Sequence, residues 1–144
     1  MVIYADTSFL FSLYAQDANS TRATELASTL DGGFIVTPLQ RFELRNALRL
    51  SVFRHEITED QCQQLLGLIE TDIKTGALVE AAVAWAEVYA EGEGLSAAHT
   101  VTAGTRALDV LHVACAATLG AHAFYTFDAR QNKLAAKAGM TVKP

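Results

Sequence analysis

The stretch Ala123-Phe124-Tyr125-Thr126-Phe127 is the clearest strand in the sequence, and Asp128 follows it directly. Aromatic and β-branched side chains favour a pleated strand, and a short apolar run of this kind is typical of a strand buried on both faces. A helical segment follows from about residue 129 to 138, and Gly139 ends it. The stretch therefore predicts a buried strand, an acid at its carboxyl end and a helix that leads away from it.

The same order of strand and helix recurs along the chain. Val2-Ile3-Tyr4-Ala5 is an apolar run that ends at Asp6, and Phe34-Ile35-Val36-Thr37 precedes Pro38, which the first turn of a helix tolerates. Shorter strands are expected at Leu78-Val79 and Met140-Thr141-Val142. Apolar residues at helical spacing predict helices over roughly residues 9–14, 21–30, 39–54, 59–76, 83–91, 108–119 and 129–138.

Strands that alternate with helices pair in parallel through right-handed crossovers. We therefore predict an α/β fold in three layers, with a short, mostly parallel central sheet flanked by helices. The chain has 144 residues and 51% hydrophobic residues, which suits one domain over residues 1–144 with its own core. Charged residues make up only 19%, which excludes the class of disordered proteins.

Composition also bounds the environment and the partners. No apolar run is long enough to span a bilayer, and the first residues carry no signal-peptide pattern, so we expect a cytoplasmic protein. Cys62 and Cys115 stand in apolar helical segments and are expected to be buried thiols. The net charge of −5 argues against a protein that holds nucleic acid through a general positive field. It does not exclude an enzyme that meets phosphate through bound cations.

Four acids from separate segments are candidates for chemistry at one edge of the sheet: Asp6, Glu43, Asp109 and Asp128. Asp6 and Asp128 each follow a strand, Asp109 lies in the first turn of the most apolar helix, and Glu43 lies near the start of the helix after the second strand. Functional groups of parallel sheets gather at the carboxyl ends of the strands. Taken singly, each acid is also readable as a helix cap, a first-turn acid or a solvated side chain.

The neighbours of these acids weaken the structural interpretations. Asp109 stands within Ala107-Leu108-Asp109-Val110-Leu111, and Glu43 stands between Phe42 and Leu44. Acids among apolar residues are costly unless a cation or hydrogen bonds compensate them, and clustered carboxylates need a counter-charge. Hard oxygen ligands select Mg²⁺ or Mn²⁺, which can drive displacement at phosphorus. No histidine or cysteine pair has zinc-site spacing, and no glycine-rich phosphate loop is present.

The quoted segments resemble those of the PIN-domain nucleases, and among them the VapC-type toxins of bacterial toxin–antitoxin pairs. The segments are Val2-Ile3-Tyr4-Ala5-Asp6-Thr7-Ser8, Phe42-Glu43-Leu44-Arg45-Asn46-Ala47-Leu48, Leu108-Asp109-Val110-Leu111-His112-Val113-Ala114 and Phe124-Tyr125-Thr126-Phe127-Asp128 with Gln131 and Leu134. They occur in the family's order and cover nearly the whole chain.

The resemblance implies a PIN fold and an endoribonuclease that depends on Mg²⁺ or Mn²⁺. It also implies a homodimer and a small antitoxin protein that blocks the site. The residues carried over as catalytic and metal-binding are Asp6, Glu43, Asp109 and Asp128, with the hydroxyls of Thr126 and Ser8 as neighbours of the metal site.

Two sets of basic residues have two interpretations each. Arg41, Arg45 and Arg49 recur on one helix face and could guide an RNA backbone or simply be solvated. Arg130, Lys133 and Lys137 on the last helix invite the same two interpretations, of which the solvated one is the default. The segment from Leu95 to Arg106 exceeds the minimal family pattern, and we expect a surface loop there rather than a flap over the site.

Other function classes stay open at this point. One is a phosphoacceptor or phosphatase on a similar sheet, but such a site needs paired acids after the first strand, and Asp6 is followed by Thr7-Ser8-Phe9. Another is a PIN-like module that binds RNA or protein without catalysis. The four acids favour the nuclease over the module, because a decayed site usually loses a ligand.

Overall fold

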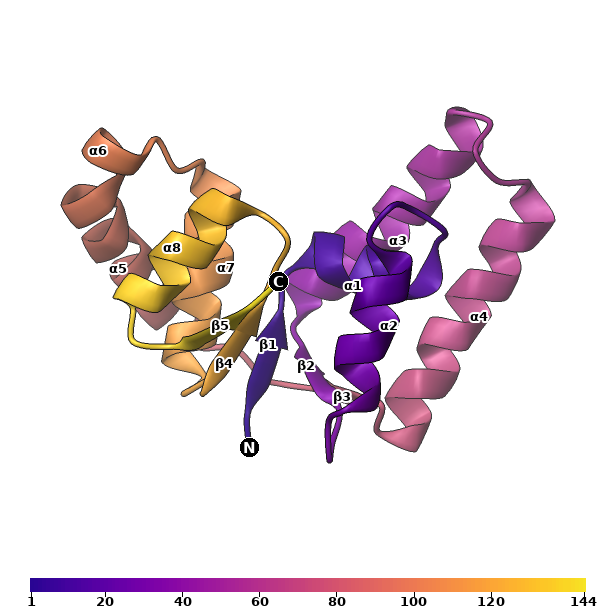
Figure 1. The fold of residues 1–144 in the computed structure, drawn as a ribbon, viewed down its shortest axis with the longest axis horizontal. Coiled ribbons are helices and arrows are strands. Elements are labelled where there is room, and N and C mark those ends of the chain that lie inside the picture. The colour runs from indigo at the N-terminus through magenta and orange to yellow at the C-terminus, as the bar shows by residue number, and fades with distance from the viewer. The chain divides into compact units, whose positions relative to one another are not determined.

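Strands and helices alternate along the computed structural model, which describes residues 1–144 (Figure 1). The strands are β1 (Ile3–Ala5), β2 (Phe34–Val36), β3 (Leu78–Glu80), β4 (Ala123–Tyr125) and β5 (Thr141–Lys143). The helices are α1 (Thr7–Tyr14), α2 (Ser20–Ser28), α3 (Pro38–Phe53), α4 (Glu59–Thr75), α5 (Trp85–Leu95), the π-helical turn η1 (Ser96–Thr100), α6 (Val101–Ala103), α7 (Ala107–Thr118) and α8 (Ala129–Lys137). Each strand predicted from the sequence is present, and the α/β class is confirmed.

Two compact units make up the chain, and each is described by itself. The first unit joins residues 1–6 to residues 82–144, and the second comprises residues 7–81. Every strand pair within a unit is parallel: β1 with β4 and β4 with β5 in the first, and β2 with β3 in the second. The parallel pairing is the one that the alternation of strands and helices predicts. No helix of the chain is both long and apolar enough to cross a membrane.

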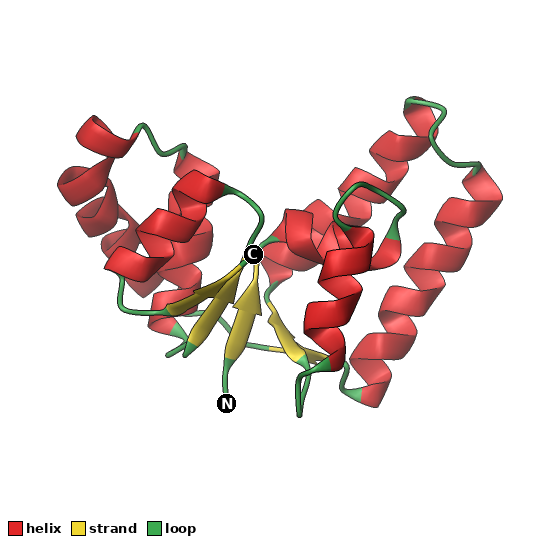
Figure 2. Ribbon diagram, viewed as in Figure 1, coloured by secondary structure: helices red, strands yellow, loops and turns green.

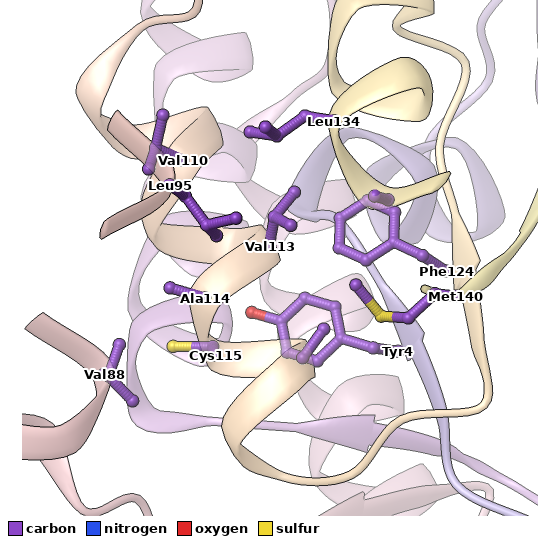
Figure 3. Packing of buried hydrophobic residues seen from close by; sticks show 12 residues of the cluster. Tyr4, Val88, Leu95, Val110, Val113, Ala114, Cys115, Phe124, Leu134 and Met140 are labelled. Atoms are coloured by element: carbon purple, nitrogen blue, oxygen red, sulfur yellow. The ribbon is translucent and has the colours of Figure 1, made fainter. Parts of the chain in front are cut away.

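The core of the first unit lies between α7 and the strands β1 and β4 (Figure 3). Tyr4 and Phe124 stack with ring centroids 5.5 Å apart, and Val113 of α7 packs with them in the same buried cluster. Helix α5 packs on α7, and α8 packs on β4 and β5 (Figure 2). Cys115 is a buried free thiol in this core, and Cys62 is a buried free thiol in the second unit, as predicted.

The second unit is held by a pair of long helices, α3 and α4, which lie side by side (Figure 1). Both begin with a capping box: Thr37 with Gln40 starts α3, and Thr58 with Gln61 starts α4. A Cβ atom at Gly33 would collide with the backbone carbonyl oxygens of Gly76 and Ala77. Glycine is therefore required where the chain enters β2.

One expectation about the first unit is wrong. The segment from Leu95 to Arg106 is not a surface loop, because the end of α5, η1 and α6 fill it up to Ala103. Gly104 then adopts a left-handed conformation, with φ of 62°, and ends the helical stretch before α7. Gly92, Gly94 and Gly104 interrupt the apolar pattern around this segment, so the sequence did not predict the helical conformation.

Candidate active site

Asp6 lies at the carboxyl end of β1, and its carboxylate is held from β4. Its backbone N–H donates to the carbonyl oxygen of Tyr125 at 3.0 Å. The hydroxyl of Thr126, one residue further on, donates to Asp6 Oδ2 at 3.1 Å. Asp6 is only 6% exposed, and Thr126 is fully buried. A nearly buried carboxylate is thus aimed by a hydroxyl that has little freedom to move.

Thr126 also ties Asp6 to the acid that follows β4. Its Oγ1 accepts a hydrogen bond from the backbone N–H of Asp128 at 3.0 Å. The same hydroxyl therefore donates its proton to the carboxylate of Asp6 and accepts a hydrogen bond from the backbone of Asp128. Thr126 therefore contacts two of the predicted acids, and its predicted place beside a metal ion stays a prediction.

Asp128 is the N-cap of α8. Its Oδ1 accepts from the backbone N–H groups of Arg130 at 2.8 Å and Gln131 at 3.0 Å. The structural interpretation of this residue is therefore correct for one oxygen. The cap leaves Oδ2 outside these bonds and fixes the direction in which the carboxylate points.

Asp109 lies in the first turn of α7, where the sequence placed it, and it is paired with a cation. Arg106 Nε donates to Asp109 Oδ2 at 3.0 Å. The hydrogen bond from Arg106 and the charge of Asp109, with a further contribution from the charge of Asp128, raise the pKa of the Arg106 guanidinium. The ion pair of Arg106 is formed with Asp109 alone.

Arg106 was not among the candidates from the sequence, although its position three residues before Asp109 is the spacing of a helical ion pair. Its side chain is 75% exposed, against 21% for Asp109. A solvated guanidinium can leave such a pair at small cost. The guanidinium therefore marks Asp109 as a carboxylate that holds a cation.

Glu43 lies in the second unit, near the start of α3. Its Oε1 accepts a hydrogen bond from Thr7 Oγ1 at 3.1 Å, and both residues are half-buried. Ser8 is exposed in the first turn of α1, and its carbonyl oxygen accepts from the hydroxyl of Ser12. The roles predicted for Glu43 and Ser8 stay predictions.

The donor set fits a hard divalent cation in its chemistry. Asp6, Asp109 and Asp128 offer carboxylate oxygens, which Mg²⁺ and Mn²⁺ prefer. Within each unit, however, no three Asp, Glu, His or Cys side chains converge closely enough to enclose an ion as they stand. Arg106 holds Asp109 Oδ2, so an ion that binds this oxygen has to displace the guanidinium.

The predicted arginine face on α3 is mostly engaged within the second unit. Arg41 donates to Glu70 at 2.9 Å and to Glu80 at 2.7 Å, and Arg45 donates to Glu70 at 2.8 Å. The hydrogen bond to Glu70 raises the pKa of Arg41. These pairs join α3 to α4 and β3, whereas Arg49 is exposed and forms no ion pair. A role of these arginines in RNA binding stays a prediction.

The chain is similar to known proteins in sequence and in fold. The model of the PIN domain family matches residues 3–137. The crystal structure of Mycobacterium tuberculosis VapC20, described as a sarcin–ricin loop cleaving toxin, is similar with a TM-score of 0.68, 19% identity and 99% coverage of each chain. FitAcB from Neisseria gonorrhoeae is similar with a TM-score of 0.62 and 16% identity over 99% of this chain and 97% of that one. No curated protein sequence matches the chain.

Proposed function

The chain belongs to the PIN-domain family, and on this premise we propose that it is a metal-dependent endoribonuclease and the toxin of a toxin–antitoxin pair. The family is a family of nucleases, and the similar fold of VapC20, itself a toxin that cleaves RNA, supports the toxin role. The observation that carries the proposal is the hydroxyl of Thr126, which donates to the carboxylate of Asp6 and accepts from the backbone N–H of Asp128. Two of the predicted acids are thereby held together at the carboxyl ends of the paired parallel strands β1 and β4.

We propose that Asp6, Asp109 and Asp128 hold Mg²⁺ or Mn²⁺, and Glu43 is the fourth acid predicted from the sequence. The bound ion would supply an activated water and neutralise charge on the phosphate oxygens. In hydrolysis the water oxygen adds to phosphorus, the bond from phosphorus to one ribose oxygen breaks, and that oxygen leaves with a proton. Thr126 keeps Asp6 in one orientation, and the cap of α8 does the same for Asp128.

The test is cleavage of a labelled single-stranded RNA in the presence of Mg²⁺, Mn²⁺ or a chelator. We expect cleavage only with a divalent ion, and a loss of more than about a hundredfold in Asp6→Asn and Asp109→Asn. Glu25→Gln is the matched control, because it also removes one carboxylate charge and Glu25 forms only an exposed pair with Arg22. Wild-type cleavage by Asp109→Asn would refute the site. Absence of both cleavage and Mn²⁺ binding in the wild type would favour the non-catalytic module.

The partners proposed are an RNA substrate, a second copy of the chain and a small antitoxin, in the cytoplasm where such RNA is found. Light scattering on the purified protein tests the dimer. Co-expression with the short reading frame next to its gene tests the antitoxin, which should co-purify and suppress cleavage. The proposed toxin–antitoxin pair would be contradicted if the protein were toxic and co-expression of the neighbouring reading frame did not suppress its toxicity.

A further inference from the structure

A basic cavity lies in the first unit, between the last helix and the helical stretch that the sequence did not reveal. Its volume is about 450 Å³. Its lining includes Arg130, Lys133 and Lys137 from α8, and His99 and Thr102 from η1 and α6. This volume falls in the range of sites that bind small molecules or parts of larger ones. No carboxylate lines the cavity.

The three α8 cations are free to act on a ligand. Arg130, Lys133 and Lys137 follow one another at spacings of three and four residues, which places them on one face of the helix. All three are exposed, and none takes part in any of the ion pairs of the chain. In a chain of net charge −5, an unpaired row of this kind is a local positive field that attracts anions.

The basic residues of the cavity follow the candidate active site in sequence along α8. The backbone N–H of Arg130 donates to Asp128 Oδ1, so the basic row starts two residues after a candidate metal ligand. A helix rises 1.5 Å per residue, so Arg130 and Lys137 stand about 10 Å apart along the axis. A single small anion cannot reach both ends of this row. A chain of phosphates that enters or leaves the site can.

We propose that this cavity binds the phosphodiester backbone of RNA beside the bond that is cut. The inference rests on the proposed ribonuclease function and adds where the substrate runs. The α8 cations meet successive phosphates, and His99 and Thr102 form the opposite wall, where the hydroxyl of Thr102 donates to the carbonyl oxygen of His99 at 3.2 Å. Backbone contacts of this kind position a nucleic acid without reading its bases, so the cavity contributes affinity and register rather than sequence choice.

The experiment measures binding of a fluorescent, mixed-sequence, single-stranded oligoribonucleotide by anisotropy, in chelator so that no cleavage occurs. The pocket variant is Lys133→Ala with Lys137→Ala. The control is Arg22→Ala with Lys74→Ala, which removes the same charge from exposed helix positions of the second unit. We expect the pocket variant to bind about 25-fold more weakly, at about fivefold per lysine, and the control within about twofold of the wild type. The slope of log affinity against log salt should flatten by about 1.4.

Two further measurements separate structural loss from charge loss and one partner class from another. Lys133→Arg with Lys137→Arg keeps both charges and should restore binding, which a packing defect would not allow. Unchanged RNA affinity in the pocket variant overturns the inference. An equal loss of RNA affinity in the control variant also overturns it. A pocket variant that loses binding of polyglutamate but keeps binding of RNA overturns it as well, and would assign the cavity to an acidic protein.

An RNA cleavage assay of the wild type in Mg²⁺, run in parallel, distinguishes failure of the RNA-binding cavity from failure of the proposed ribonuclease function. A wild type that cuts RNA, with a pocket variant that binds it normally, refutes the cavity and leaves the nuclease standing. A pocket variant that loses RNA, in a protein that cuts none, supports the cavity as an RNA site and refutes the nuclease.

Discussion

Replacement of Thr126 by valine should destabilise the protein and misplace Asp6. Valine has nearly the shape of threonine, so the packing around this fully buried side chain is kept while both hydrogen bonds of the hydroxyl are lost. A hydrogen bond to a charged group contributes about 1.5–3 kcal/mol, and the backbone N–H of Asp128 loses its acceptor at a cost of about 1 kcal/mol. We expect Thr126→Val to lower the free energy of unfolding by about 3 kcal/mol.

Thr126→Ser is the matched control, because it keeps the hydroxyl and loses one methyl group, worth about 1 kcal/mol. Urea denaturation of the two variants should therefore place serine about 2 kcal/mol above valine. In a chain of this size a loss of 3 kcal/mol lowers Tm by roughly 6–12 °C.

Activity gives a second measurement that stability alone would not move. At a temperature where both variants are folded, RNA cleavage should fall in Thr126→Val and persist in Thr126→Ser, because serine keeps the hydroxyl that donates to the carboxylate of Asp6. A valine variant as stable and as active as the serine variant would show that the two hydrogen bonds neither hold the fold nor aim the carboxylate.

Further outcomes follow from other contacts. Arg106→Gln removes the cation paired with Asp109, and Mn²⁺ should bind roughly two- to fivefold more tightly in calorimetry; weaker binding would mean that Arg106 helps to build the site. Burial, then the hydrogen bond to Asp72 and its charge, raise the pKa of the Tyr14 phenol, so the unfolded chain alone ionises above about pH 10 and stability should fall as pH rises beyond that value. Tyr14→Phe should show a smaller loss of stability between about pH 9 and 11, and an equal loss would assign the alkaline sensitivity elsewhere. The amide of Gln131 is fully buried without a protein hydrogen-bond partner, so Gln131→Met should raise the unfolding free energy by about 1 kcal/mol, and a decrease would show that the amide has an essential polar contact.

The fold was predictable because local signals and burial agree along most of the chain. The apolar runs that end at Ala5, Val36 and Tyr125 form buried strands, and the helix bounds fall within a few residues of the expected ones. Thr37 and Pro38 mark the start of α3 through interactions within a few residues. Thr37 forms a capping box, and the ring of Pro38 fixes its φ at a helical value. Such signals do not need tertiary contacts to be read.

The stretch from residue 95 to 106 has a conformation that local sequence signals do not predict. Its serine, threonines, valine and Gly104 are weak helix formers, and its apolar residues do not recur at helical spacing, so an isolated peptide of this composition has little reason to fold. In the protein, Leu95 is buried in the core cluster and holds the start of η1, so tertiary packing decides the conformation. The same stretch forms one wall of the cavity. The spacing of Arg130, Lys133 and Lys137 was visible in the sequence, but the opposite wall that turns a solvated face into a cavity was not.

The candidate site shows that a structural and a functional interpretation of one acid can both hold. Asp128 caps α8 through Oδ1, and the two backbone donors fix the carboxylate plane and therefore the direction of Oδ2. Thr126 then restrains the backbone of Asp128 and the carboxylate of Asp6 through a single hydroxyl. A ligand set for a hard cation needs oxygens held in place before the ion arrives, because each side chain frozen on binding costs conformational entropy. The cap thus gives the carboxylate of Asp128 the fixed orientation that the proposed metal site requires.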